Sequence, residues 1–196
     1  RAIKIKFFTN HIVFNIFTKN LIKFSELKNV KYFKEFTRND PKPKTYKVLP
    51  NKYKTKVTDF QIKEIYYKIK KYDQKKLQKI RYSNYIYYQK ELSSIKEIFF
   101  NKLKKNNKHG CLFFPFYYSK RGELYKYLLK NNIDVSKYYY RDCSNMKIFE
   151  KYNSKCSNSK RLCNEVILLP TYPSYKKENM KKNVLMIKKF FNSKSY

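Results

Sequence analysis

The stretch from Val166 to Phe191 constrains the fold most, because it predicts a strand, a sharp turn and a helix in direct succession. Val166 to Leu169 is a short apolar run that Pro170 and Pro173 end, since proline fixes φ and lacks an N–H donor. We expect Ser174 to cap the helix that follows. The apolar residues at helical spacing in that helix are Met180, Val184, Ile187 and Phe191.

The length and apolar content indicate a folded chain without a membrane segment. At 196 residues and 42% hydrophobic content, the chain is long enough for one or two modest cores. No apolar run approaches the roughly 20 residues that cross a bilayer. The first residues, with Lys4 and Lys6 among Ile and Phe, lack a small-residue cleavage site. We therefore expect a cytoplasmic protein.

The net charge of +33 is typical of proteins that bind nucleic acid, but the kind of charge weakens that interpretation. Six of the 47 cations are arginines, whereas phosphates and base edges favour the planar guanidinium group. The excess of Lys, Asn, Tyr, Ile and Phe is what A/T-rich codons produce. We interpret the charge mostly as compositional drift, and non-specific nucleic-acid binding remains an alternative.

The four cysteines do not predict a metal site. They contain no C-x-x-C pair, and structural zinc usually needs closely spaced ligand pairs. Reduced thiols, some of them buried, are the simpler interpretation. His11 and His109 have no neighbouring Ser, Cys or carboxylate that indicates catalysis.

Hydrophobic periodicity predicts an α/β fold in which long helices accompany a small sheet covered by helices. The three prolines between Arg38 and Pro50 indicate a linker, which divides the chain into residues 1–50 and 51–196. Thr58 and Gln61 form a capping box. The expected strands are His11 to Phe17, Cys111 to Tyr118, Ile133 to Tyr140 and Val166 to Leu169. The expected helices are Lys19 to Phe36, Thr58 to Tyr72, Asp73 to about Lys105, one capped by Ser119, one over Ser157 to Val166, and the terminal helix. The helix over Thr58 to Tyr72 carries an apolar stripe of Ile62, Ile65, Tyr66, Ile69 and Tyr72.

Several segments, in the right order, resemble the DegT/DnrJ/StrS family of sugar aminotransferases. The LPTYP turn at Leu169 to Pro173 is similar to the family's C-terminal turn before its closing helix. KYKTKVTDFQ, Lys52 to Gln61, looks like the loop before the family's long helix, and KIRYSNYIYYQKEL carries Arg81 in the family's Arg position. Phe114 to Arg141 and Phe17 to Val30 also resemble family segments.

The resemblance implies the C-terminal small domain of an aspartate-aminotransferase-like fold, preceded in residues 1–50 by a remnant of the large domain and a linker. It implies an enzyme that uses pyridoxal phosphate (PLP) to move an amino group from glutamate to a nucleotide-linked keto-sugar. The implied partners also include a second copy in a homodimer, or an intact subunit. The acidic group at the pyridine nitrogen and most phosphate donors belong to the family's large domain, so we expect this chain to be inactive alone.

The resemblance places three candidate site residues. Lys6 falls where the family has the lysine that binds PLP covalently, with Lys4 as a poorer fit. Lys54 or Lys56 falls where related enzymes reach the cofactor phosphate of a neighbouring subunit. Asn or Arg is typical there, although a lysine can pair with phosphate as a point charge. Two rival functions remain open: a basic RNA- or ribosome-binding protein, and a non-catalytic partner subunit of an intact enzyme.

Overall fold

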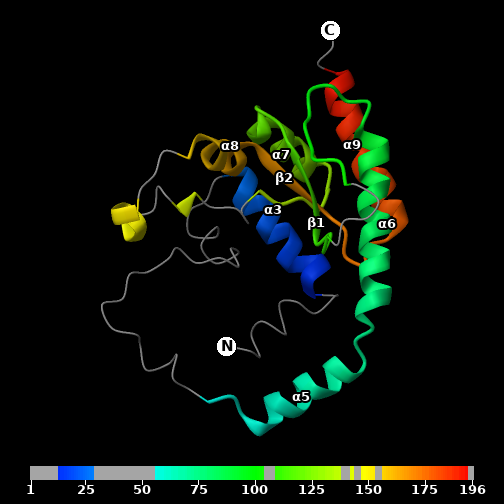
Figure 1. The fold of residues 1–196 in the computed structure, drawn as a ribbon. Helices are drawn as coiled ribbons and strands as arrows, with labels where there is room; N and C mark the ends of the chain where they lie inside the picture. Colours follow the sequence, from blue (N-terminus) through cyan, green and yellow to red (C-terminus); the bar gives the residue numbers. More distant parts are fainter. Residues whose placement is uncertain are drawn as a thin grey trace.

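A computed structural model describes residues 13–28, 56–103, 109–137, 142–143, 147–152 and 156–193. Within these ranges the fold is mixed α/β with a two-stranded antiparallel sheet, which confirms the expected class (Figure 1). The elements in chain order are the π-helix η1 (Phe14–Thr18), α3 (Lys19–Leu27), α5 (Asp59–Lys70), α6 (Gln74–Leu92), β1 (Phe113–Tyr117), α7 (Arg121–Lys130), the 3-10 helix η4 (Lys147–Tyr152), α8 (Ser157–Glu165), β2 (Val166–Pro170) and α9 (Lys177–Asn192).

The sheet lies at the centre of the core. Phe114 of β1 is opposite Leu169 of β2, and Phe116 is opposite Ile167. Phe114 and Phe116 are fully buried, while the alternate residues of β1 are half-buried. All five residues of β2 are buried, so both faces of this strand are covered. A continuous apolar run is the pattern that such a strand requires.

Pro115 explains why β1 makes so little further pairing on its outer edge. Tyr117 exchanges backbone hydrogen bonds of 2.7 and 3.0 Å with Phe99 on that edge. Pro115 faces the same edge two residues earlier and has no N–H to donate, so the pairing stays a single bridge. On the far edge of the sheet, Leu168 exchanges backbone hydrogen bonds of 2.8 and 3.1 Å with Ser136. The predicted strand from Ile133 is therefore a single bridge within its described part.

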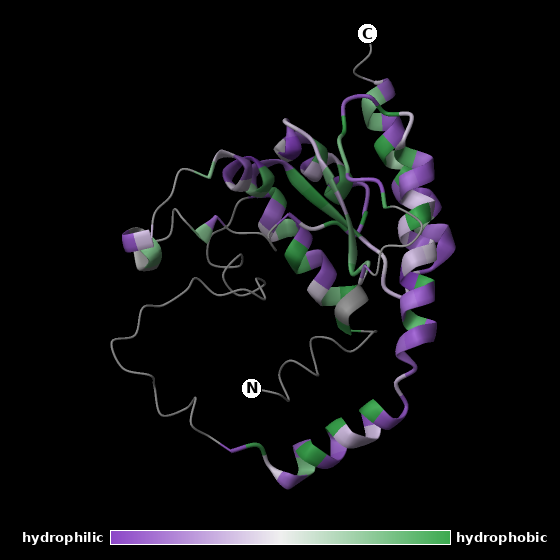
Figure 2. Cartoon of the chain, viewed as in Figure 1, coloured by the Kyte–Doolittle hydropathy of each residue, from purple (hydrophilic) through white to green (hydrophobic). Residues whose placement is uncertain are grey.

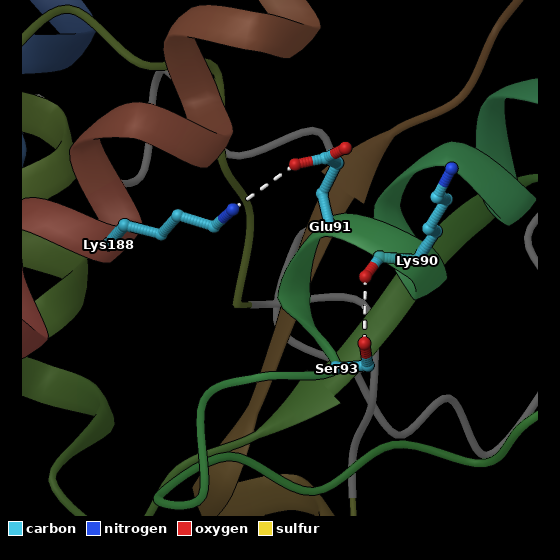
Figure 3. A network of polar contacts seen from close by, with 4 residues as sticks. All are labelled: Lys90, Glu91, Ser93 and Lys188. Carbon is cyan, nitrogen blue, oxygen red and sulfur yellow. Dashed lines mark hydrogen bonds and ion pairs between the residues drawn. The ribbon is translucent and has the colours of Figure 1, made fainter.

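α6 and α9 pack against each other beside the sheet (Figure 1). Lys188 of α9 forms an ion pair with Glu91 of α6 at 3.1 Å, as Figure 3 shows. In the same view, the Ser93 hydroxyl donates to the Lys90 carbonyl at 2.7 Å. This bond satisfies one of the carbonyl groups that the end of α6 leaves without a helical partner.

Aromatic rings fill the space between the sheet and α6. The Phe114 ring lies 4.9 Å from the Tyr85 ring, 5.5 Å from Tyr88 and 5.2 Å from Phe100, measured between centroids. Leu168 and Leu169 are buried as predicted. The predicted apolar face of the closing helix is also confirmed, since Met180, Val184, Ile187 and Phe191 are all buried.

The prediction of a strand over His11 to Phe17 is wrong for its described part. Residues 13–17 are helical and run into α3, which ends at Leu27. A short apolar run does not distinguish a strand from a helical segment, which explains the error. The burial of side chains in α3 also does not follow their polarity. Phe24 is 49% exposed, whereas Ser25 and Glu26 are buried.

The helix predicted from Asp73 to about Lys105 ends at Leu92, which corrects its C-terminal half. Beyond that point Ile98 and Phe100 are buried while Phe99 is 59% exposed, so the burial period is two and not 3.6. The bridge from Phe99 to Tyr117 requires extended backbone there, and tertiary pairing overrides the helical pattern.

Two predicted caps are also wrong, although the helices themselves are present. α7 begins after Lys120 instead of Ser119, and α9 begins after Lys176 instead of Ser174, in both cases without a side-chain capping bond. By contrast, the Thr58 capping box of α5 is confirmed. α5 lies beyond the N-terminal end of α6 and apart from the core (Figure 1). Among the described helices, none is both long enough and apolar enough for a bilayer crossing.

Candidate functional site

Of the three sequence-predicted site residues, only Lys56 lies in the described part of the chain. It is exposed, on the non-helical segment 56–58 directly before α5. Thr58 anchors this segment: its hydroxyl accepts from the Gln61 backbone N–H at 3.3 Å, and the Gln61 side chain accepts from the Thr58 N–H at 3.0 Å. Lys6 and Lys54 lie outside the described residues, so the proximity of the three lysines is untested.

A polar corner forms where α3 meets the end of α7 and the turn after β2. It consists of Lys19, Lys23, Asn132, Asp134 and Tyr172. The Lys23 ammonium donates to the Asn132 side chain at 3.0 Å and to the Lys130 carbonyl at 3.1 Å. A cation at this position complements the negative C-terminal end of α7. This interaction fixes α3 on the fold although the two segments are over 100 residues apart.

Asp134 and Tyr172 form the second contact in the polar corner. The Tyr172 hydroxyl donates to Asp134 Oδ2 at 3.1 Å. Although part of Asp134 is exposed, desolvation raises the pKa of its carboxyl group, and the Tyr172 hydrogen bond and the Lys19 ammonium oppose that rise. Desolvation is the largest cause that raises the pKa of Tyr172, and the negative charge of Asp134 raises it further. Tyr172 is therefore a hydrogen-bond donor at neutral pH and not a base.

The side chains of the polar corner offer polar groups but do not include an activated nucleophile. Two ammonium groups, a carboxylate and a phenol supply both donors and acceptors for a polar molecule. The five side chains contain no thiol or imidazole. This arrangement supports recognition of a polar ligand more than a chemical step.

A buried network lies next to the polar corner, on the core side. The Asn183 amide donates to the Tyr88 hydroxyl at 2.9 Å, and the Tyr175 hydroxyl donates to Asn183 Oδ1 at 3.2 Å. Burial is the main cause that raises the pKa of Tyr88, and it raises the pKa of Tyr175 to about 12. The ring of Tyr172 packs edge-on against Tyr175 at 5.2 Å. The network is structural, and it holds the turn that carries Tyr172.

Among the described residues, the thiols and the His109 imidazole do not form a centre of their own. Cys111 is buried with φ at +46°, and its N–H donates to Nδ1 of His109 at 3.0 Å. Its carbonyl accepts from the buried Thr171 hydroxyl. All four cysteines are free thiols. Across the described ranges, no group of three or more His, Cys, Asp or Glu residues is arranged to hold a metal ion.

A shallow open pocket lies where α5 meets α6. At the edge of this pocket, Lys71 Nζ lies 4.2 Å from the centre of the Tyr67 ring. The residues that line it are Tyr67, Lys68, Lys71, Tyr72, Asp73, Lys76 and Leu77. The pocket shares no residue with the polar corner and is open to solvent, so nothing in its geometry indicates chemistry.

Comparisons with known proteins agree on one family. The family model for the DegT/DnrJ/EryC1/StrS aminotransferase family matches residues 25–188. A search of curated protein sequences finds no match. Among solved structures, the fold is similar to the sugar aminotransferase CalS13 of Micromonospora echinospora, with a TM-score of 0.54 and 17% identity, covering 59% of this chain and 31% of that one.

Two further solved structures also match this fold. A DegT/DnrJ/EryC1/StrS aminotransferase from Brucella abortus has a TM-score of 0.53 and 17% identity, covering 59% of this chain and 31% of that chain. The aminotransferase TlmJ of Streptoalloteichus hindustanus has a TM-score of 0.57 and 11% identity, covering 63% of this chain and 34% of that chain. At these identities the likeness shows the fold alone. The chain spans about a third of the length of the structures it matches.

Sequence reasoning missed the buried Asn183 and its tyrosine partners. A signal was present, because Asn183 falls between Met180 and Val184 on the face whose other members are apolar. A polar residue on an apolar helix face must find buried partners, so it predicts a network. The Asp134–Tyr172 contact joins residues 38 positions apart and has no comparable local signal.

Proposed function

The chain belongs to the DegT/DnrJ/EryC1/StrS aminotransferase family, and on that premise we propose that it is the C-terminal part of a PLP-dependent nucleotide-sugar aminotransferase. The observation that carries this proposal is the family match over residues 25–188, together with structural neighbours of which this chain covers 31 to 34%. The proposed reaction moves an amino group from glutamate to a keto-sugar on a nucleotide.

The described residues fit PLP only in part. When bound, PLP supplies the electron sink that amino transfer requires. The support among the described residues is Lys56, which is exposed directly before α5 at the position that the family resemblance assigns to a contact with the phosphate in a neighbouring subunit. One point charge does not make a cofactor site. We therefore propose that the chain is inactive without the larger part of the family fold.

The polar corner gives this chain a role in recognition within that enzyme. The Lys19 ammonium acts on Asp134, the Lys23 ammonium donates to Asn132, and the Tyr172 hydroxyl is held as a donor. These groups suit the hydroxyl and phosphate oxygens of a nucleotide-linked sugar. In this proposal the polar corner binds and orients the substrate.

Three measurements test the proposal. Adding PLP to the purified chain should produce no visible absorbance band of a cofactor bound covalently to lysine, and a band that disappears in the Lys6→Ala variant would show that the chain holds the cofactor alone. An antibody against α9 should detect a polypeptide clearly larger than 24.2 kDa, or a complex with an intact family subunit. Purified from cells, that larger species should transfer the glutamate amino group to a nucleotide-linked keto-sugar.

A further inference from the structure

α3 lies beside α7 but outside the hydrophobic core. Among the described residues, the core is formed by α6, β1, α7, β2, α9 and the segments between them, and no residue of α3 takes part. Figure 2 shows apolar and polar residues mixed along α3. Its two buried residues are polar, namely Ser25 and Glu26, whereas Phe24 is exposed. The remaining apolar residues of the helix are half-buried: Leu21, Ile22 and Leu27. Since buried polar groups add little hydrophobic stabilisation, α3 depends on other contacts.

Polar contacts at the end of α7 hold α3 in place. The Lys23 ammonium bonds the Lys130 carbonyl and the Asn132 side chain, and both hydrogen bonds are exposed to solvent. The Lys19 ammonium acts on the Asp134 carboxylate through space. Exposed charged contacts of this kind contribute little to stability, because water screens them. The docking of α3 therefore depends on a few weak interactions.

The length of α3 makes the helix itself dependent on docking. It has nine residues and no side-chain capping bond at its N-terminus. Isolated helices shorter than about 12 residues are marginal in water. The π-helix η1 directly precedes α3, and π-helical turns are rare and occur often at functional sites. When α3 leaves the end of α7 it should therefore unfold, so that detachment and unfolding are one event.

The docking of α3 also sets the charge of the polar corner. Lys19 and Lys23 belong to α3, whereas the other members, Asp134 among them, follow α7 and β2. The polar corner has a net positive charge when α3 is docked and a net negative charge when α3 is detached. Both lysines precede residue 25, where the family match begins, so the match assigns them no role.

We propose that α3 is a strap that detaches from the end of α7 and docks again while the core stays folded, and that docking switches the polar corner from negative to positive charge. The strap itself is independent of amino transfer. Its effect on a phosphate group in the polar corner rests on the proposed function. A docked strap favours an anion there, and an anion that binds there favours the docked strap in return.

Hydrogen exchange of the full chain, followed segment by segment, tests the strap. We expect α3 to exchange at least about ten-fold faster than α9, because local opening needs less free energy than global unfolding. Lys23→Ala should speed exchange in α3 at least about three-fold and leave α9 unchanged. Lys28→Ala is the matched control, since Lys28 is exposed at the end of the same helix and the substitution removes the same charge. It should change exchange in α3 less than about 1.5-fold.

Three results would overturn the strap. Equal exchange rates in α3 and α9 would mean that α3 opens only when the whole chain unfolds. Equal effects of Lys23→Ala and Lys28→Ala would mean that docking does not depend on the end of α7. If Lys23→Ala speeds exchange in α9 as much as in α3, then α3 is an integral part of the core.

Inorganic pyrophosphate, added at constant ionic strength, tests the charge of the polar corner. It should slow exchange in α3 at least about two-fold in the unmodified chain and have no such effect in Lys19→Ala. Equal slowing in both chains, or none in the unmodified chain, would overturn the attraction of a phosphate group to the polar corner. Because the probe contains neither sugar nor PLP, this failure is distinct from the absence of amino transfer.

Discussion

The side-chain amide of Asn183 on α9 donates a 2.9 Å hydrogen bond to the hydroxyl of Tyr88 on α6, and both residues are buried. This bond connects two helices that are almost a hundred residues apart in sequence. Because buried polar groups are costly when unpaired, the pair stabilises one arrangement of α6 and α9 over alternatives.

We predict that Asn183→Ala lowers the free energy of unfolding by about 1–3 kcal/mol, because it leaves the Tyr88 hydroxyl buried without its partner. Asn179→Ala is the matched control, since Asn179 is exposed on the same helix and should change stability by less than about 0.5 kcal/mol. Urea unfolding followed by circular dichroism measures both. Similar losses from the two variants would exclude a special role for the buried pair.

Leu169→Ala should cost about 2–5 kcal/mol, because Leu169 is fully buried in β2 and truncation leaves a cavity. Lys182→Ala, on the exposed side of α9, should stay within about 0.5 kcal/mol. The denaturant midpoints of the two variants, compared at an unchanged m-value, measure the difference in stability. If both substitutions have equal effects, Leu169 is not buried in solution as it is in the structure.

Stability should fall with rising pH once the buried tyrosines titrate. Burial raises the pKa of Tyr175 to about 12, and it raises that of Tyr88 as well, both from an unfolded value of 10.0. The folded state therefore retains protons that the unfolded state loses, so stability is fully present below about pH 10 and declines as pH rises through about 12. Melting temperatures across this range measure the decline, which should be shallower in Tyr88→Phe. A constant melting temperature over the same range would rule out these shifts.

Thr58→Ala should destabilise α5 without affecting the core. The substitution removes the capping box, worth about 1 kcal/mol of helix stability, from a helix with no buried residue. Hydrogen exchange should show faster exchange in α5 and unchanged protection in β1, β2 and α9. Thr58→Ser keeps the hydroxyl and serves as the control. A fall in global stability would mean that α5 packs on the core after all.

RNA binding by the purified chain should be weak, independent of sequence and strongly dependent on salt. Lysine contacts with phosphates act through counterion release, so affinity should fall by orders of magnitude between about 50 and about 200 mM salt. Filter binding with several unrelated RNAs measures this. Tight binding of one RNA sequence that survives about 200 mM salt would favour the rival ribosome-binding function.

Local signals were sufficient for several elements. The apolar run from Val166 to Leu169 is buried as predicted, and so are the apolar residues at helical spacing from Met180 to Phe191. A continuous apolar segment and a helix with one apolar side each have few stable environments. The Thr58 capping box is likewise present, since it depends on residues three positions apart.

Tertiary structure decided what local patterns leave open. The helical spacing through Phe99 gave way to an extended bridge, because pairing with Tyr117 and burial of Ile98 and Phe100 outweigh intrinsic helix preference. The stripe of α5 shows the converse: its pattern predicts an amphipathic helix, and the helix forms, yet the stripe stays exposed. A sequence determines which faces are apolar, but burial requires a second surface at the right distance. Only the packed fold supplies that surface.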